Sequence, residues 1–453
     1  QDQLLDEFDA AAGACGLTAS IAVLKGGDNY FCTRRLDRLI STLEEGDLEG
    51  RFIAAVLSRL TETVEGATRE DVSQWLMSRF PGAASMVDEV AVSCGHAECG
   101  RSAAIARANS ADLVVMNQVL WLKPPQGLTP LGLVVIDEAH DLEEMTTLAL
   151  TEEVSSAGLN GLADRLVPAG RSGLLEAARH AGGDVRAART LARRLRSTST
   201  NARDALATFG NAVSADVSVE DGGTVRLKRA PKTLHPGAWH GADQYVRDLL
   251  DCLKELAAAL ADLAGEVTDH LVEEDLWLLS ERARALEDLL WQITTARNSA
   301  LVHFLEVEPE SSGGWRLARA PTEVAAFLHE IWADLGGFLL ISATLQSGPS
   351  DFTFLVDRLG LRGVLTGGTH AVGTDFPFES NVLFGIARWF ESIPVPRFMP
   401  EFQHETADEI ATLAEVGEGR LMALFTSRAR VTEERTAIAE RLDKAGADLV
   451  SLS

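Results

Sequence analysis

The chain has 453 residues, of which 46% are apolar and 24% charged, a composition that is typical of globular proteins and excludes a largely disordered chain. Its 41 basic and 67 acidic residues give a formal net charge of −26, which argues against non-specific adhesion to nucleic acid or to an anionic membrane. No stretch reaches the ~18 uninterrupted apolar residues of a membrane-spanning helix. The chain starts without the basic and apolar regions of a signal peptide, and five cysteines are too few for a disulfide scaffold, so we expect a cytoplasmic protein.

Short apolar segments, several of them rich in β-branched residues, predict the strands of an α/β fold. The expected strands are residues 19–24, 112–117, 131–136, 338–342, 381–384 and 421–425. The segments 112–117 and 131–136 lack an alternating pattern, which is typical of parallel strands buried on both faces.

The remaining segments are expected to be mainly helical. Residues 1–12 are expected to be the end of a helix, helix-period apolar residues predict helices over 33–80, and 81–100 is expected to be irregular. The amphipathic run 241–297 predicts long helices in a large insert between the third and fourth strands. Turns rich in glycine at 221–223 and 311–314 predict two β-hairpins.

The strand over 131–136 is followed directly by Asp137, Glu138, Ala139 and His140. Side chains at the carboxyl end of a parallel strand project into the ligand crevice of such a sheet. Asp137 suits the coordination shell of Mg²⁺, Glu138 can orient or deprotonate an attacking water, and His140 can couple the site to neighbouring elements. The alternative is an acidic strand end followed by a helix N-terminus, where carboxylates are favourable in any case.

A second strand end carries Ser342, Ala343 and Thr344. Small hydroxyl side chains at this strand end can line a nucleotide site and link that site to a second domain. The alternative for this triplet is a turn or a helix cap.

Together, these motifs resemble those of the DinG-like and XPD-like superfamily 2 DNA helicases. Asp137 to His140 is similar to that family's Walker B or DEAH box, and residues 24–32 are similar to its entry into an iron–sulfur domain, although Gly27 stands where the family has Arg. The other segments that resemble family motifs, in the family's order, are residues 1–4, 112–118, 315–317, 320–321, 376–379 and 425–427.

The resemblance implies an α/β protein with two RecA-like parallel-sheet motor domains, an inserted iron–sulfur-type helical domain and a helical arch. The expected division is a first motor domain from 1–25, 111–152 and 321–350, an iron–sulfur-type insert over 26–110, an arch over 153–320, and the start of a second motor domain over 351–453. The implied activity is ATP- and Mg²⁺-dependent unwinding of forked DNA by 5′→3′ translocation on a single strand, by a monomer.

The sequence departs from the family at the phosphate-binding loop. Such a loop needs a Gly-Lys-Ser/Thr step, and none of the six lysines follows a glycine. We therefore expect an internal segment of a longer helicase that does not hydrolyse ATP by itself. The alternative is a non-catalytic DNA-binding or scaffold protein that retains the helicase fold. A Mg²⁺-dependent nuclease would need a second carboxylate cluster, which no other strand end provides.

The cysteines predict an incomplete set of cluster ligands. Cys32, Cys94 and Cys99 match three positions of the family's 4Fe–4S site, which usually has four thiolates. The fourth ligand could be His96, Asp88 or Cys15; otherwise the site is degenerate and the cysteines are free thiols. Cys252 falls in the expected arch.

Candidate DNA contacts come from basic, aromatic and hydroxyl residues. Six arginines between residues 185 and 203, with no acid among them, predict a basic helix face that could follow phosphates, or else a solvated face paired with acidic neighbours. Thr426 and Ser427 at a strand end could bind phosphates, with a helix N-cap as the alternative. The residues named as candidate DNA contacts are Tyr30, Asn117, Arg193, Thr426 and Ser427.

Overall fold

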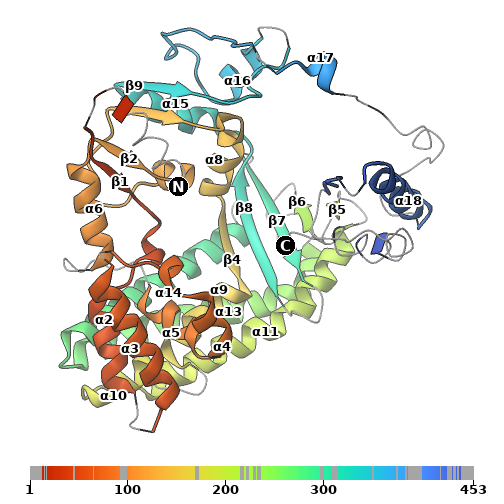
Figure 1. Cartoon of the computed structure of the whole chain (residues 1–453). Helices are drawn as coiled ribbons and strands as arrows, with labels where there is room; N and C mark the ends of the chain where they lie inside the picture. Colours follow the sequence, from red (N-terminus) through yellow and green to blue (C-terminus); the bar gives the residue numbers. More distant parts are fainter. Residues whose placement is uncertain are drawn as a thin grey trace. The chain divides into compact units, whose positions relative to one another are not determined.

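A computed structural model of the chain is mixed α/β and mostly helical (Figure 1). It describes residues 13–14, 16, 18–43, 46–64, 66–91, 99–168, 173–214, 219–220, 224–227, 231, 236–295, 300–308, 314–348, 351–373, 376–382, 385, 400–418, 420–425, 431, 435 and 438–439. The chain divides into two compact units, Gln1–His370 and Ala371–Ser453, each of which we describe by itself. Among the described residues, no helix is both long and apolar enough to cross a membrane.

The first four expected strands are present as two parallel pairs. Strand β1 (Ile21–Val23) pairs with β2 (Leu113–Val115), and β3 (Leu133–Ile136) pairs with β9 (Gly337–Leu340). The described residues thus contain two separate two-stranded parallel sheets, with helix α6 (Gly100–Ser110) packed against β1. This arrangement is consistent with the predicted α/β class.

The expectation that residues 131–136 are buried on both faces is wrong. In β3, Val134 and Ile136 are buried, whereas Leu133 is 69% and Val135 57% exposed. The buried face packs against helices α7 (Gln118–Leu122), α8 (Leu142–Leu150) and α15 (Ala325–Asp334). The described residues leave the opposite face of β3 exposed, which the unbroken apolar run did not predict.

A small helical region follows β1. It contains η1 (Gly27–Asn29), α2 (Thr33–Thr42), α3 (Leu48–Thr63), η2 (Arg69–Asp71), α4 (Gln74–Arg79) and α5 (Ala83–Val90). The helices expected over 33–80 are therefore confirmed, with turns between them. The expected irregular segment is wrong over 83–90, because Ala83, Met86, Val87 and Val90 lie at helical spacing and are all buried in the core of this region.

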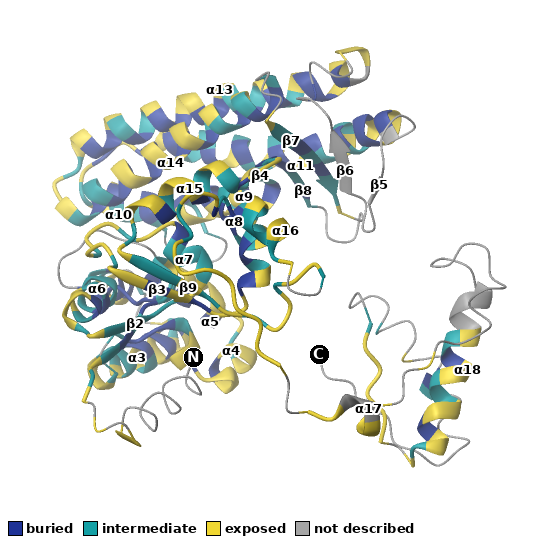
Figure 2. Ribbon diagram, turned by 90° about the horizontal axis from the view of Figure 1, so that it is seen from above, coloured by how far each residue is buried: buried dark blue, intermediate teal, exposed yellow. Residues whose placement is uncertain are grey.

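The large insert joins long helices to an antiparallel sheet. Its helices are α9 (Ser156–Leu166), α10 (Leu174–His180), α11 (Arg186–Ser214), α13 (Pro236–Glu266) and α14 (His270–Thr295). Helix α13 packs against both α11 and α14, and their facing sides are buried (Figure 2). The amphipathic run 241–297 is thus confirmed as the greater part of α13 and α14.

The sheet of this insert has the strand order β4-β8-β7-β6-β5. Its strands are β4 (Glu152–Ser155), β5 (Val219–Glu220), β6 (Thr224–Leu227), β7 (Leu301–Val307) and β8 (Trp315–Pro321). Antiparallel pairing of β5 with β6 and of β7 with β8 confirms both predicted hairpins.

The rest of the chain differs from expectation. Helix α16 (Thr353–Arg358) packs with the first unit, so the division at residue 370 lies beyond the domain boundary that we placed at 350. In the second unit, Asn381 ends helix α17 (Phe378–Asn381) and residues 421–425 are irregular, so neither expected strand is confirmed.

Helix α18 (Pro400–Val416) is the last helix along the chain for which the structure gives bounds. The helix end expected over 1–12 lies outside the described residues.

Candidate active site

The candidate site lies where strands β3 and β9 end. The two strands are parallel and in register, with Ile136 opposite Leu340, so their carboxyl ends share one edge. Two backbone hydrogen bonds continue the pairing beyond the strands, from Ile341 N to Ile136 O (2.9 Å) and from Ala139 N to Ile341 O (3.0 Å). They hold the segment of Asp137 beside the segment of Ser342.

Three of the predicted side chains meet at this edge. The Nδ1 atom of His140 lies 2.7 Å from Ser342 Oγ and 3.1 Å from Glu138 Oε2. The Ser342 hydroxyl also lies 3.2 Å from the same carboxylate oxygen, to which it can donate. The Glu138 backbone is left-handed (φ 49°), a conformation that is uncommon for a residue other than glycine. Residues that are two hundred positions apart thus form one polar network.

Asp137 and Thr344 lie beside this network through backbone contacts. The backbone N–H of Glu138 donates to Asp137 Oδ1 (2.9 Å), and the backbone N–H of Thr344 donates to Ser342 Oγ (3.3 Å). The sequence-based assignment missed Gln118, whose Nε2 donates to the carbonyl of Asp137 (3.0 Å). Its position directly after Asn117, at the end of the second strand segment, was the available signal.

The site is open to solvent and rich in carboxylates. The side chains of Glu138 and His140 are 61% and 39% exposed. No described group of three or more His, Cys, Asp or Glu side chains is placed to hold a metal ion. A carboxylate such as that of Asp137 still fits Mg²⁺ bound together with a nucleotide, because Mg²⁺ commonly takes one or two carboxylates and completes its shell with phosphates and water.

Two of the predicted cluster cysteines come together. Cys32, which precedes α2, and Cys99, which precedes α6, are both buried and pack against each other. The backbone N–H of Gly100 donates to the carbonyl of Phe31 (3.2 Å), which ties the two segments together. The described residues thus supply two neighbouring thiols, whereas Cys94, His96 and Cys15 lie outside them.

The other candidate ligands are engaged elsewhere. Asp88 forms an ion pair with Arg69. Cys252 is buried in the core of the large insert, where its thiol donates to the carbonyl of Leu191 (3.4 Å). Burial raises the pKa of Cys252 to about 11, so this thiol stays protonated at neutral pH.

Two of the candidate DNA contacts have structural roles. Tyr30 is buried, and its hydroxyl accepts a hydrogen bond from the backbone N–H of Lys25 (2.8 Å), so its ring is not on the surface for stacking. Asn117 caps α7 by accepting from the backbone N–H of Leu120 (2.7 Å). Thr426 and Ser427 lie outside the described residues.

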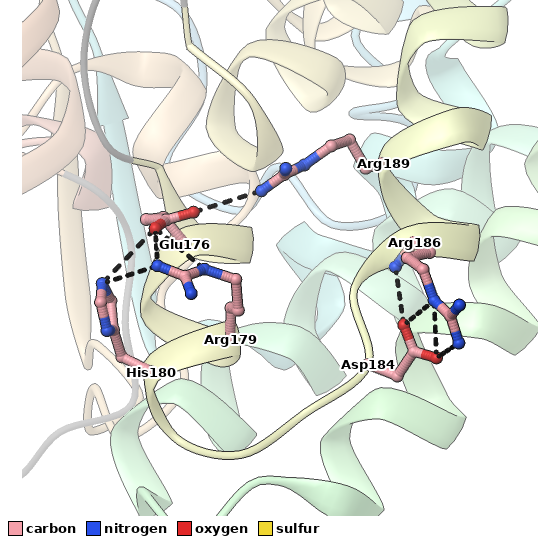
Figure 3. Close-up of polar contacts among 6 residues, drawn as sticks. All are labelled: Glu176, Arg179, His180, Asp184, Arg186 and Arg189. Atoms are coloured by element: carbon pink, nitrogen blue, oxygen red, sulfur yellow. Dashed lines mark hydrogen bonds and ion pairs between the residues drawn. The ribbon is translucent and has the colours of Figure 1, made fainter.

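The arginines of α11 mostly pair with acids. Glu176 accepts from Arg179 and from Arg189 (3.2 Å for Arg189 Nη2), and Asp184 pairs with Arg186 (Figure 3). The hydrogen bonds from Arg186 lower the pKa of Asp184 to about 2. The other ion pairs of this row are Arg194 with Glu255, Arg196 with Asp164, and Arg203 with Asp204.

This pattern favours the solvated, acid-paired face over a phosphate track for five of the six arginines. Arg193 differs, because it is exposed and has no ion pair with another described residue. Arg193 as a DNA contact therefore stays a prediction.

Comparison with known proteins relates the chain to DNA helicases at a distance. No protein-family model matches it. It is 27% identical over 175 residues to the ATP-dependent DNA helicase YoaA of Haemophilus influenzae, which covers 35% of this chain and 27% of that protein. It is also 27% identical over 192 residues to YoaA of Escherichia coli, covering 38% of this chain and 29% of that protein. The chain thus matches less than a third of the length of either relative, and the similarity indicates a helicase-related protein.

Proposed function

We propose that the chain is a motor segment of an ATP-dependent DNA helicase of the DinG-like type. The observation that carries this proposal is the network of Glu138, His140 and Ser342 at the shared end of β3 and β9. The distant similarity to two DNA helicases supports it. Single-stranded and forked DNA are the proposed substrates, with translocation in the 5′→3′ direction by a monomer.

Asp137 and the three residues of the network have roles in the proposed hydrolysis of ATP. Asp137 would hold the Mg²⁺ that accompanies the nucleotide, and this ion would neutralise charge on the phosphates. Glu138 orients the attacking water and accepts its proton. His140 holds the Glu138 carboxylate through a direct contact and through Ser342, so a shift of the strand end at Ser342 moves the acid as well.

The chain by itself is proposed to be inactive as an ATPase. A Gly-Lys-Ser/Thr step cradles the nucleotide phosphates in motors of this kind, and none of the six lysines here follows a glycine. Without that cradle, the acids at the end of β3 have no bound nucleotide on which to act.

The test compares this chain with a polypeptide that extends it to supply the Gly-Lys-Ser/Thr step. We expect no DNA-stimulated ATP hydrolysis from the chain alone. In the extended protein, Glu138→Gln should lower kcat by roughly 10²–10⁴-fold, the range typical of a lost general base. Glu144→Gln is the matched control, because Glu144 is exposed on the neighbouring helix α8.

Two results would contradict the proposal. Hydrolysis by the unextended chain would contradict its inactivity, and an undiminished rate in the extended Glu138→Gln protein would remove Glu138 from the chemistry. A second candidate function is a non-catalytic DNA-binding or scaffold protein, which the missing Gly-Lys step favours. If the reading frame upstream of residue 1 encodes no Gly-Lys-Ser/Thr step, the second function is favoured.

An iron–sulfur cluster is a separate part of the proposal. Cys32 and Cys99 are adjacent, but two thiols do not make the four-ligand site of a 4Fe–4S cluster. We assign no step of the reaction to a cluster. Anaerobic purification tests for one: broad visible absorbance with about four irons per chain would show it, and a colourless, iron-free protein would refute it.

A further inference from the structure

Three aromatic side chains gather on the surface of the small helical region. Phe52 lies on α3, Trp75 on α4, and Phe80 directly after α4. The ring centroids of Phe52 and Phe80 are 5.2 Å apart, and those of Trp75 and Phe80 are 5.6 Å apart. Phe52 is 44% and Trp75 60% exposed, although both are large apolar residues. We call these three residues the aromatic platform.

Core packing and backbone hydrogen bonds hold the platform in place. Phe80 packs against the buried core of α2, α3 and α5, so the central ring is anchored. Ser73 caps α4 by accepting from the backbone N–H of Leu76 (3.3 Å). After Phe80, the backbone N–H of Gly82 donates to the carboxylate of Glu49 (3.2 Å), which ties this turn to the start of α3. The exposed rings therefore belong to a fixed surface, with little ordering needed on binding.

Positive charge accompanies the rings. Arg51 precedes Phe52, and the Arg79 guanidinium lies 5.8 Å from the centroid of the Phe80 ring. Both arginines are exposed, and neither has an ion pair with another described residue. Two acids close to Arg51 in the sequence accept backbone hydrogen bonds, since Asp47 caps α3 and Glu49 accepts from Gly82. In a chain with a net charge of −26, exposed rings with one unpaired arginine over Phe80 and a second next to Phe52 in the sequence point to an anionic partner that can stack.

We propose that the aromatic platform, with Arg51 and Arg79, binds single-stranded nucleic acid. Every base has a flat face that stacks on exposed aromatic rings without sequence preference, and arginines beside the rings meet the phosphates. A duplex keeps its bases stacked on one another, so the platform selects unpaired strands. This inference rests on the proposed function and names a surface for its substrate that lies on other elements than the ends of β3 and β9.

The test is fluorescence anisotropy with a labelled oligothymidylate and with a labelled duplex of the same length. Trp75→Ala and Phe52→Ala should each weaken single-strand binding about tenfold, within the range for loss of one stacked base. Trp75→Phe should retain most of the affinity. Trp291→Ala is the matched control, because Trp291 on α14 is similarly exposed at 56% and should leave binding unchanged. Circular dichroism verifies that each variant is folded.

The salt dependence tests the arginines. Arg51→Gln combined with Arg79→Gln should lower the slope of log K against log salt by about 1.4, since each phosphate contact to a single strand contributes about 0.7. Arg284→Gln, which removes an arginine that pairs with Glu281 on α14, is the control.

The outcomes separate the inference from the proposed function. If the wild-type chain binds single strands and the platform variants bind equally well, the platform is refuted and the helicase proposal stands. If the wild-type chain binds no single strand, the platform is refuted, whereas the helicase proposal is decided by the ATPase and unwinding tests of the extended polypeptide. An equal loss of single-strand and duplex binding in Trp75→Ala would overturn stacking as the mode of binding.

Discussion

At the residue scale, the corner after β3 holds an acidic side chain in a backbone conformation that few residues adopt. Glu138 has φ 49° and ψ 45°, a left-handed conformation that costs roughly 1–2 kcal/mol for a residue with a Cβ atom. The hydrogen bond from Ala139 N to Ile341 O and the contacts of the carboxylate with His140 and Ser342 hold it there. Such strain is commonly found at functional positions, and here it aims the carboxylate at the neighbouring strand end.

This strain has a measurable consequence. Glu138→Gly and Glu138→Ala both remove the carboxylate, but only glycine adopts a left-handed backbone without penalty. We expect the glycine variant to be more stable than the alanine variant by about 1 kcal/mol, measured by urea unfolding at neutral pH. An alanine variant as stable as the glycine variant would contradict a left-handed Glu138.

A second residue-scale prediction concerns His303, which is buried on β7 opposite Arg319. Burial, and then the charge of Arg319, lower the pKa of His303 below its ordinary 6.5. The unfolded chain therefore binds more protons between the folded pKa and 6.5. The contribution of His303 to stability is fully present above 6.5 and is lost as the pH falls through the folded pKa.

We therefore expect wild-type protein to lose more thermal stability than His303→Leu between about pH 7.5 and about pH 5. Differential scanning calorimetry of both proteins across this range makes the comparison. His180→Leu is the control, because His180 is exposed on α10. Parallel pH profiles for the wild type and His303→Leu would contradict a buried neutral histidine.

At the element scale, a buried carboxylate joins the small helical region to the large insert. Asp275 on α14 accepts from Arg35 Nη2 (2.5 Å) and from Arg38, both on α2. Asp275 and Arg35 are buried. Removing the shared acid would leave a buried guanidinium without its partner, which is far more damaging than the loss of an exposed ion pair.

Asp275→Ala should therefore lower the free energy of unfolding by about 3–5 kcal/mol. Glu281→Ala, which breaks an exposed pair with Arg284 on the same helix, should lower it by less than about 1 kcal/mol. Urea unfolding of the two variants measures both changes. Equal effects would show that the α2–α14 contact is not a buried ionic link.

Local patterns predicted the elements well wherever a short segment determines its own structure. The turn glycines at 222–223 and 313–314 lie between strands that pair, and the parallel strands follow from short apolar runs. The segment 83–90 was missed because a short helix with small residues has only a weak periodic pattern in the sequence. Its helical face is recognised from the burial of Met86 and Val90, which only the structure shows. Burial of β3 on one face depends on what packs there, which an apolar run alone does not reveal.

At the scale of the whole molecule, the predicted site depended on the order of motifs along the chain. That order assigned residues 137–140 and 342–344 to the ends of two strands, and in the structure Glu138 and His140 meet Ser342 because the two parallel strands share an end. It did not anticipate Gln118, whose contact is with the carbonyl of Asp137, or the burial of Tyr30. Both depend on how helices pack around the strands, which residue types alone do not specify.

The measurement that tests the account most directly is strand displacement with the polypeptide extended to supply the Gly-Lys-Ser/Thr step. The substrates are two otherwise identical partial duplexes, one with a 5′ single-stranded tail and one with a 3′ tail, in the presence of ATP and Mg²⁺. The account predicts that the 5′-tailed duplex is unwound, the 3′-tailed duplex is not, and Glu138→Gln abolishes unwinding while Glu144→Gln does not. Failure to unwind either substrate, or unwinding that survives Glu138→Gln, would contradict it.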